Sequence, residues 1–227
     1  VRIDGRPGTR AELVRSVPVQ VLEPASHGLV AGPPLVRRQF LDWSVFHVEH
    51  VFLEAWQQYR RALQQRNAAL KQHSMEAAWA WDSALLSTGL LVDQCRRHLV
   101  DRLTEPLRQT GISLLDAEIE LKYRSGWAEG TEFGAALFTA RDRDQQMSST
   151  TVGPHRADLV VTVKERRARD TVSRGQEKLV VAALTLAQIQ VVAEALGRTV
   201  ILLVDEPGAD LDRTHLQKLL SAVLTAP

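Results

Sequence analysis

The chain is poor in cysteine, in aromatic residues and in net charge. Its 227 residues include one cysteine, and 5% of them are aromatic. The single cysteine, Cys95, excludes an internal disulfide and fits a reducing cytoplasm, where we expect the protein to be. The formal net charge is +1, so a nucleic-acid site would have to be a local basic patch. We expect no apolar run to approach the length of a membrane span, and no signal peptide is visible.

A second absence concerns phosphate binding. The loop Gly-x-x-x-x-Gly-Lys-Ser/Thr, whose N–H groups and lysine surround nucleotide phosphates, does not occur. The chain begins at Val1 rather than at methionine, and it stops at Pro227 directly after an expected helix. The sequence therefore predicts an internal piece of a longer protein.

The hydrophobic fraction of 44% is enough for a core, and its pattern is helical over a long stretch. Residues 40–110 are almost free of glycine and predict two long helices, joined at Gln72-His73-Ser74 and packed as an antiparallel pair. Four basic residues of the first helix are expected to face outward: Arg60, Arg61, Arg66 and Lys71. This face either follows a phosphate backbone or is only solvated.

The clearest strand signal lies near the end of the chain. Five consecutive apolar residues, Val200 to Val204, are followed by Asp205 and Glu206. Such a run predicts a strand buried on both faces of a parallel sheet. The two acids then stand at the carboxyl end of the strand, where α/β sheets bind ligands. Asp205 is suited to hold Mg²⁺ through water, and Glu206 is suited to polarise an attacking water.

A helix is predicted to begin at Ser173-Arg174-Gly175-Gln176 and to end at Gly197. Its first turn offers a hydroxyl, backbone N–H groups and the positive end of the helix dipole to an anion. The same Ser-x-x-Gln spacing is that of an ordinary capping box. Both interpretations stay open on the spacing alone.

Two further segments carry positive charge. The loop Gly153-Pro154-His155-Arg156-Ala157-Asp158 could bind phosphate, or its guanidinium could pair with Asp158 as part of a structural turn. A strand is expected over Leu159 to Lys164, ending in a basic hairpin that carries Arg166 and Arg167. This hairpin either contacts DNA or is a solvated turn.

The order of the later elements resembles the head of ABC-type ATPases. A capped helix, an apolar strand, Asp-Glu and a loop ending Asp210-Leu211-Asp212 correspond to its signature motif, Walker B strand and D-loop. Further segments narrow the resemblance to the RecF family of DNA replication and repair proteins: a Gly-x-Pro spacer, Arg37 to Asp42, Gln65 to Leu70, Gly153 to Asp158, and Ser173 to Gln176. One departure is Pro207, where many members of the family carry an aromatic residue after the acids.

The resemblance implies an α/β fold, an ABC-type ATPase head whose parallel or mixed sheet has flanking helices and an inserted helical lobe. Residues 1–36 would form part of nucleotide-binding lobe I. Residues 37–148 would be the helical lobe II, and residues 149–227 would return to lobe I. Lobe I would carry the signature motif, the Walker B strand and the D-loop.

The resemblance also implies ATP and Mg²⁺ as cofactors. Glu206 would be catalytic and Asp205 would hold the metal. Ser173, Arg174, Gly175 and Gln176 would contact nucleotide held by a second copy, and Asp212 would line the dimer seam. Contacts to DNA are expected from a set of basic residues: Arg60, Arg61, Arg66, His155, Arg156, Arg166 and Arg167.

The function implied is that of an ATP-dependent DNA-binding protein of recombinational repair and replication restart, linked to the SOS response. It would bind single-stranded and gapped or junction DNA, dimerise on ATP, and help recombination mediator proteins to load recombinase. A weak DNA-stimulated ATPase is expected of the full-length protein, and none of this piece alone. Two alternatives stay open: the nucleotide-binding subunit of a transporter, whose signature would have glycine at Arg174, and a non-hydrolysing ATP-gated scaffold.

Overall fold

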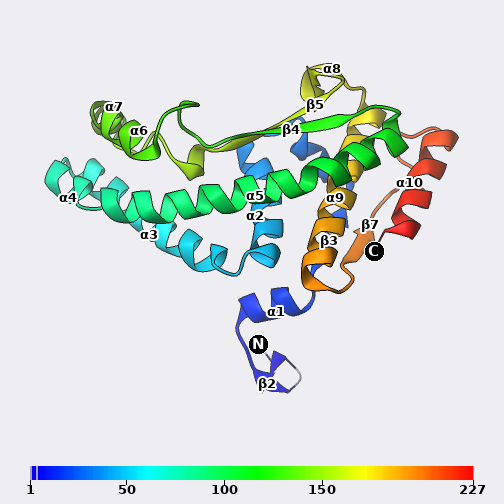
Figure 1. Cartoon of the computed structure of the whole chain (residues 1–227), viewed down its shortest axis with the longest axis horizontal. Helices are drawn as coiled ribbons and strands as arrows, with labels where there is room; N and C mark the ends of the chain where they lie inside the picture. Colours follow the sequence, from blue (N-terminus) through cyan, green and yellow to red (C-terminus); the bar gives the residue numbers. More distant parts are fainter. Residues whose placement is uncertain (1, 4, 227) are drawn as a thin grey trace. The chain divides into compact units, whose positions relative to one another are not determined.

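The computed structural model describes residues 2–3 and 5–226, except for the side chain of Ala25. The chain divides into two compact units (Figure 1). The first unit comprises Val1–Val36, Asp101–Leu121 and Val161–Pro227, and the second comprises Arg37–Val100 and Lys122–Val160. Residues 101–121 and 149–160 thus group differently from the lobes expected above. The assignment of nucleotide-binding and helical lobes stays a prediction, because compactness alone does not define a function.

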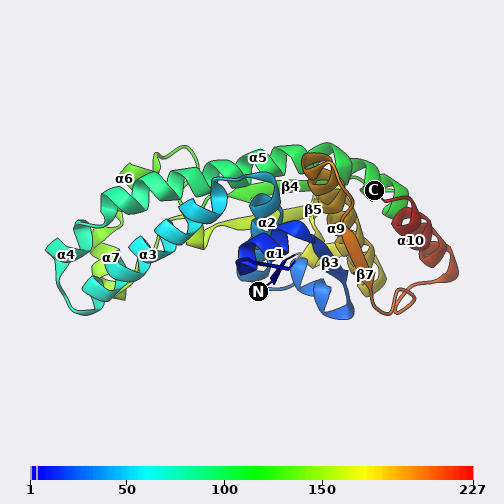
Figure 2. The same cartoon turned by 90° about the horizontal axis from the view of Figure 1, so that it is seen from below.

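The first unit contains a short parallel sheet. Strand β3 (Val19–Leu22) pairs with β7 (Ile201–Val204), with Val19 opposite Ile201 and Leu22 opposite Val204. Both strands lie within two residues of the segments that their apolar patterns predict, Val17 to Val21 and Val200 to Val204. Figures 1 and 2 show helix α9 (Arg174–Leu196) beside this pair from two directions.

The expectation that β7 is buried on both faces is wrong. Its exposure alternates, with Ile201 48% exposed and Leu203 53% exposed. The physical reason is that β7 pairs with one strand, β3, and one face of this pair is uncovered in the part of the chain that the structure describes. An apolar run shows that a strand is hydrophobic, but it does not show whether one or both of its faces are covered by other elements.

Helix α9 is the core helix of the first unit, and it begins and ends where the sequence predicts. Ser173 is its N-cap, and Gly197 ends it in the left-handed conformation, with φ of +62°. The expectation that no apolar run approaches a membrane span is wrong for this helix, which is long and apolar enough to cross one. However, 78% of its most apolar stretch is buried inside the structure. A buried core helix passes the same test of length and composition, so α9 is weak evidence for a membrane segment.

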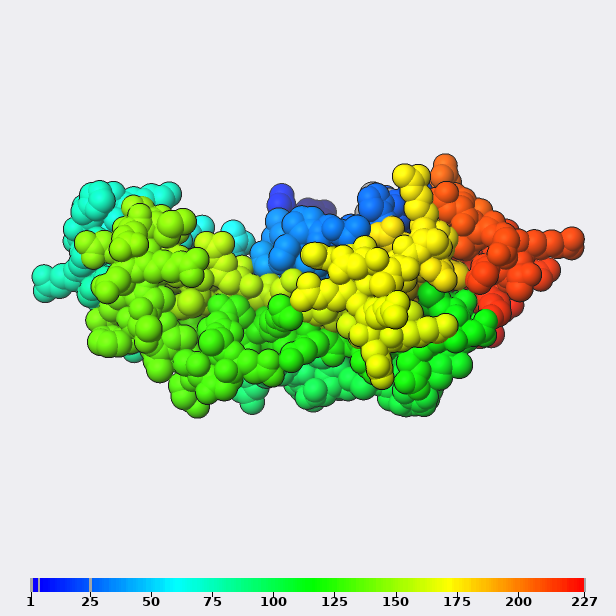
Figure 3. Space-filling view, turned by 90° about the horizontal axis from the view of Figure 1, so that it is seen from above, coloured from blue at the N-terminus to red at the C-terminus, as the bar shows by residue number. Residues whose placement is uncertain are grey.

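The remaining elements of the first unit are short. They are β1 (Arg2–Ile3), β2 (Arg6–Pro7), α1 (Arg10–Ser16), η1 (Pro24–Leu29), β6 (Arg166–Arg167), α8 (Ala168–Thr171) and α10 (Arg213–Thr225). Lys164 and Glu165 turn the chain between β5 (Asp158–Val163) and β6 with φ of +50° and +62°, as a tight hairpin requires. Figure 3 shows the segment around β6 and α8 (yellow) next to the end of α5 (Asp82–Leu115, green).

The second unit is mainly helical. Its elements, some of which continue into the first unit, are α2 (Pro34–Val48), α3 (Phe52–Lys71), α4 (Met75–Trp79), α5 (Asp82–Leu115), α6 (Phe133–Thr139), α7 (Arg141–Met147), η2 (Pro154–Arg156), β4 (Ile119–Arg124) and β5. The predicted turn at residues 72–74 is confirmed, and His73 turns the chain with φ of +54°.

The first long helix expected from the sequence is instead two helices, α2 and α3. Its apolar residues include Phe46 and Phe52, which are six residues apart. At 3.6 residues per turn, this spacing places them roughly 120° apart around the axis, so one straight helix cannot point both at the centre of one face. The pattern of residues 132–143 predicts one further helix with mixed charges, and the structure has two helices there, α6 and α7.

Candidate functional site

The loop after β7 carries the two acids proposed for the metal and for catalysis. Asp205 and Glu206 are exposed, and the N–H of Asp205 donates to the carbonyl of Leu22 over 2.9 Å. Glu206 and Asp210 adopt positive φ of +46° and +60°, which non-glycine residues rarely do. Non-glycine residues that the surrounding structure holds in such strained backbone conformations cluster at functional sites. We call residues 205–212 the acid loop.

The acid loop ends at Asp212, which caps helix α10. Its carboxylate accepts from the N–H of His215 over 2.9 Å and lies 2.7 Å from Nδ1 of the same residue. These hydrogen bonds hold the pKa of Asp212 below its ordinary value. Asp212 is exposed, so a second role at a dimer seam is compatible with its capping role.

At the start of α9, the capping box is present. Ser173 Oγ accepts from the N–H of Gln176 over 3.3 Å, and Gln176 Oε1 accepts from the N–H of Ser173 over 3.0 Å. Ser173, Arg174 and Gln176 are exposed. The Ser173 hydroxyl keeps its own proton available as a donor, so capping does not exhaust its hydrogen-bonding capacity.

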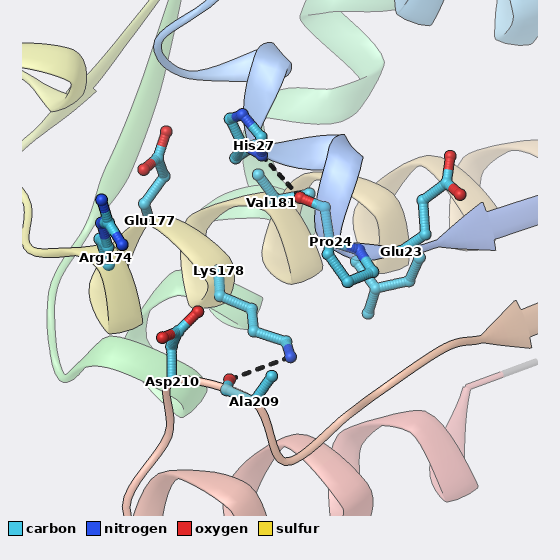
Figure 4. A pocket seen from close by; sticks show the side chains of 10 residues that line it. Glu23, Pro24, His27, Arg174, Glu177, Lys178, Val181, Ala209 and Asp210 are labelled. Atoms are coloured by element: carbon cyan, nitrogen blue, oxygen red, sulfur yellow. Dashed lines mark hydrogen bonds between the residues drawn. The ribbon is translucent and has the colours of Figure 1, made fainter.

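The start of α9 and the acid loop are packed directly together within the first unit. Lys178 Nζ donates to the carbonyls of Glu206 and Ala209, the latter over 3.0 Å (Figure 4). A Cβ on Gly175 would lie 2.7 Å from the carbonyl oxygen of Asp210. The contact made by Lys178 was not predicted from the sequence. Its only signal is a cation in the first turns of an otherwise apolar helix.

A pocket of about 480 Å³ adjoins these residues. Its charged lining consists of Glu23, His27, Arg174, Glu177, Lys178 and Asp210 (Figure 4). Glu177 Oε1 is buried there without a hydrogen-bond partner among the described residues. The lining therefore offers both signs of charge to a polar ligand.

The residues present fit one side of a magnesium–nucleotide site. Carboxylates at the end of a parallel strand suit Mg²⁺, which keeps several waters and needs one or two protein ligands. No group of three or more histidine, cysteine or acidic residues that could cage a metal occurs among residues 2–3 and 5–226. The phosphate loop is absent from the sequence, so these residues would supply only the metal and water side of such a site.

In the second unit, His155 uses both ring nitrogens internally. Nε2 lies 3.0 Å from the carbonyl of Thr150, which can only accept, and Nδ1 lies 2.6 Å from the Tyr59 hydroxyl. The ring therefore donates from Nε2 and accepts at Nδ1. Burial is the main cause that lowers the pKa of His155 to about 4, and the positive charges of Arg156 and Arg38 contribute to the shift. A neutral ring with both nitrogens engaged is a structural histidine rather than a phosphate ligand.

The segment Arg37 to Asp42 contacts the loop 153–158 through its two arginines. Arg37 binds Asp158 through Nε over 2.7 Å and Nη2 over 3.2 Å. Arg38 Nη1 donates to the carbonyl of Ala157 over 2.7 Å. The open alternative of an Arg156–Asp158 pair is thus excluded, because Asp158 pairs with Arg37 and Arg156 is exposed.

The expectation that Arg66 faces outward is wrong. Arg66 is fully buried and paired with Asp82 over 2.8 Å and Asp144 over 2.7 Å. The reason is its spacing: Arg66 lies seven residues after the buried Tyr59 and four after the buried Ala62, on the same face of α3. Arg60 and Arg61 are exposed as expected, and so are Arg166 and Arg167 on the hairpin of the first unit.

No family model matches the chain. It is 42% identical over 223 residues to the DNA replication and repair protein RecF of Pseudomonas fluorescens (strain SBW25), covering 96% of this chain and 61% of that protein. It is 40% identical over 219 residues to RecF of Chromohalobacter salexigens, covering 95% of this chain and 61% of that protein. The chain therefore spans about three fifths of the length of the curated relatives it matches.

Two solved structures share the fold. The recombination mediator protein RecF with ATP, from the RecFOR pathway, matches with a TM-score of 0.80 and 20% identity, over 89% of this chain and 59% of that one. The same protein with ATPrS matches with a TM-score of 0.86 and 21% identity, over 96% of this chain and 64% of that one. The predicted α/β fold class is confirmed, and it is the fold of these RecF structures. By sequence and by fold, the chain is similar to proteins named RecF over about three fifths of their length.

Proposed function

We propose that the protein is an ATP-dependent DNA-binding protein of recombinational repair and replication restart. The observation that carries the proposal is the direct packing of the signature segment on the acid loop, through Lys178 and Gly175, in a chain about 40% identical to DNA repair proteins. In the arrangement proposed here, the acid pair faces the nucleotide of its own chain and the helix start faces that of a second copy, so their backbone contact can couple the two nucleotide sites.

In this proposal, Asp205 holds Mg²⁺ through water and Glu206 orients the attacking water, while bound Mg²⁺ offsets the charge of the phosphates. Ser173, Arg174, Gly175 and Gln176 face the nucleotide of a second copy, and Asp212 lines the seam between the two copies. The exposure of Ser173 and Arg174 supports this role, because a contact in trans needs an accessible helix start.

The DNA contacts proposed are the exposed basic residues Arg60, Arg61, Arg156, Arg166 and Arg167. Arg66 and His155 are withdrawn from this set, because the first is buried and paired and the second has both nitrogens engaged. We propose single-stranded and gapped or junction DNA as the target. The wider role is assistance to recombination mediator proteins in loading recombinase, in the cytoplasm and within the SOS response.

The test of the trans arrangement separates nucleotide binding from assembly. In the complete protein, Ser173→Arg is expected to preserve ATP binding by the monomer and to abolish the ATP-dependent dimer. Ser87→Arg, at an exposed serine of α5 in the second unit, is the matched control and should dimerise normally. Light scattering with and without ATP measures the outcome. A dimer that forms normally with Ser173→Arg would contradict the trans contact.

A further inference from the structure

The loop 153–158 lies in a group of charges that do not balance. The group, here called the arginine cluster, contains Arg37, Arg38, Arg96 and Arg156 with the carboxylates Asp42 and Asp158. All six residues belong to the second unit. Four guanidinium groups face two carboxylates, so two positive charges are in excess.

Each carboxylate of the cluster is already engaged by one arginine. Arg37 binds Asp158 through two nitrogens, and Arg96 binds Asp42 over 2.8 Å and 3.0 Å. Arg96 also donates to the carbonyl of Pro154 over 2.7 Å. Among the residues that the structure describes, Arg38 and Arg156 have no carboxylate partner. The excess charge therefore resides on these two side chains.

Arg38 is held in place rather than freely solvated. Its Nη1 donates to the carbonyl of Ala157, so its guanidinium lies beside the residue that follows Arg156. Arg38 is half-buried, and burial together with the charges of Arg96 and Arg156 lowers its pKa. The neighbouring His155 is neutral at physiological pH and adds no charge. Arg38 is thus a fixed, partly desolvated cation beside a second cation, and a bound anion would offset the repulsion between the two.

We propose that Arg38 and Arg156 bind a phosphate group of a nucleic-acid backbone between them. A guanidinium group presents paired N–H donors that match two phosphate oxygens, and Arg38 is pre-oriented, so little side-chain freedom is lost on binding. The adjacent residues Arg37 and Arg38 then have different roles. Arg37 is buried and locks Asp158, whereas Arg38 keeps N–H groups for a ligand.

The assignment to a polymer rather than to a free phosphate rests on neighbouring charge. Tyr59, whose hydroxyl contacts His155, is followed on α3 by the exposed Arg60 and Arg61. Cations on adjoining segments suit an anion with repeating charges. This inference rests on the proposed DNA-binding function, and it adds Arg38 to the contacts.

Fluorescence anisotropy with a labelled single-stranded oligonucleotide tests the site in the complete protein. Arg38→Gln and Arg156→Gln are each expected to weaken binding about tenfold at fixed salt, the scale of one charge-assisted hydrogen-bonded contact. The slope of log K against log salt should fall by roughly 0.7, the value for one phosphate on a single strand. Arg143→Gln, at an exposed arginine of α7 in the same unit, is the matched control and should change affinity less than twofold.

Two variants separate loss of the site from loss of the fold. Arg156 is exposed, so Arg156→Gln leaves the fold intact. Arg38→Lys keeps a charged donor and should retain more affinity than Arg38→Gln. Unchanged affinity and slope in both glutamine variants would overturn the site while leaving DNA binding through other residues in place. Absence of oligonucleotide binding by the unaltered protein would overturn the nucleic-acid assignment. In that case, an arginine-dependent rise in thermal stability with pyrophosphate would show that the site takes free phosphates instead.

Discussion

Arg66 is the buried centre of a polar network in the second unit, and its replacement is expected to be strongly destabilising. Its Nε donates to Asp82, and its Nη1 donates to Asp144 over 2.7 Å and to Thr150 Oγ1 over 2.8 Å. The guanidinium carbon lies 4.9 Å from the ring centroid of Trp79. In Arg66→Met, the carboxylate of Asp144 stays fully buried and loses its counter-ion.

The size of the effect follows from what remains around Asp144. Breaking a buried ion pair by removing one partner costs about 3–5 kcal/mol. Asp144 still accepts from the N–H and the hydroxyl of Thr151, over 2.8 Å and 2.6 Å, which favours the low end of that range. In a chain of this length each kcal/mol shifts the unfolding midpoint by about 2–4 °C. We therefore expect Arg66→Met to lower the midpoint by about 10 °C.

Thermal unfolding followed by circular dichroism measures this shift, and Arg61→Met on the exposed face of the same helix is the matched control. The control should move the midpoint by less than about 2 °C, because exposed substitutions cost under about 0.5 kcal/mol. The double variant Arg66→Met/Asp144→Asn removes the stranded charge and should recover about 1 kcal/mol or more relative to additive behaviour. If Arg66→Met and Arg61→Met have the same midpoint, the buried network does not stabilise the unit.

Three further predictions use other contacts. The pKa of His155 is about 4 in the folded protein against an ordinary 6.5, so the stability that its neutral ring contributes is fully present above pH 6.5 and is lost as the pH drops toward 4. His155→Gln should therefore flatten the curve of unfolding midpoint against pH between 6.5 and 4. Parallel curves for the variant and the unaltered protein would contradict this. Gly175→Ala, which drives a Cβ into the Asp210 carbonyl, should cost about 1–3 kcal/mol in urea unfolding, and a neutral result would refute the close packing. Lys178→Met should speed amide hydrogen exchange across residues 205–212, and unchanged exchange would show that Lys178 does not hold the acid loop.

Features set by neighbouring residues could be predicted from the sequence. The capping box at Ser173 and the left-handed end at Gly197 depend on residues within one turn, and both are present. The strand ending at Val204 and the hairpin that carries Arg166 and Arg167 follow from equally local patterns. Local backbone geometry needs no partner from elsewhere in the chain, so spacing alone specifies it.

Features set by distant partners could not be predicted. Arg66 looks like a surface cation on α3 until Asp82 and Asp144, 16 and 78 residues away, are brought to it. The role of Lys178 depends on carbonyls of the acid loop, about 30 residues further along the chain. Backbone carbonyls have no sequence signature, so such a contact becomes visible only in the folded structure.

The central claim is that Glu206 positions water for ATP hydrolysis in a DNA-binding ATPase, and single-turnover phosphate release by the complete protein with single-stranded DNA tests it most directly. Glu206→Gln should slow release by about 100-fold or more while ATP binding is retained, which is the scale of losing a positioned base. Glu165→Gln is the matched control, an exposed glutamate that also has positive φ, and it should release phosphate at the unaltered rate. Equal rates for Glu206→Gln and the unaltered protein, or no DNA-dependent release by either, would contradict the account.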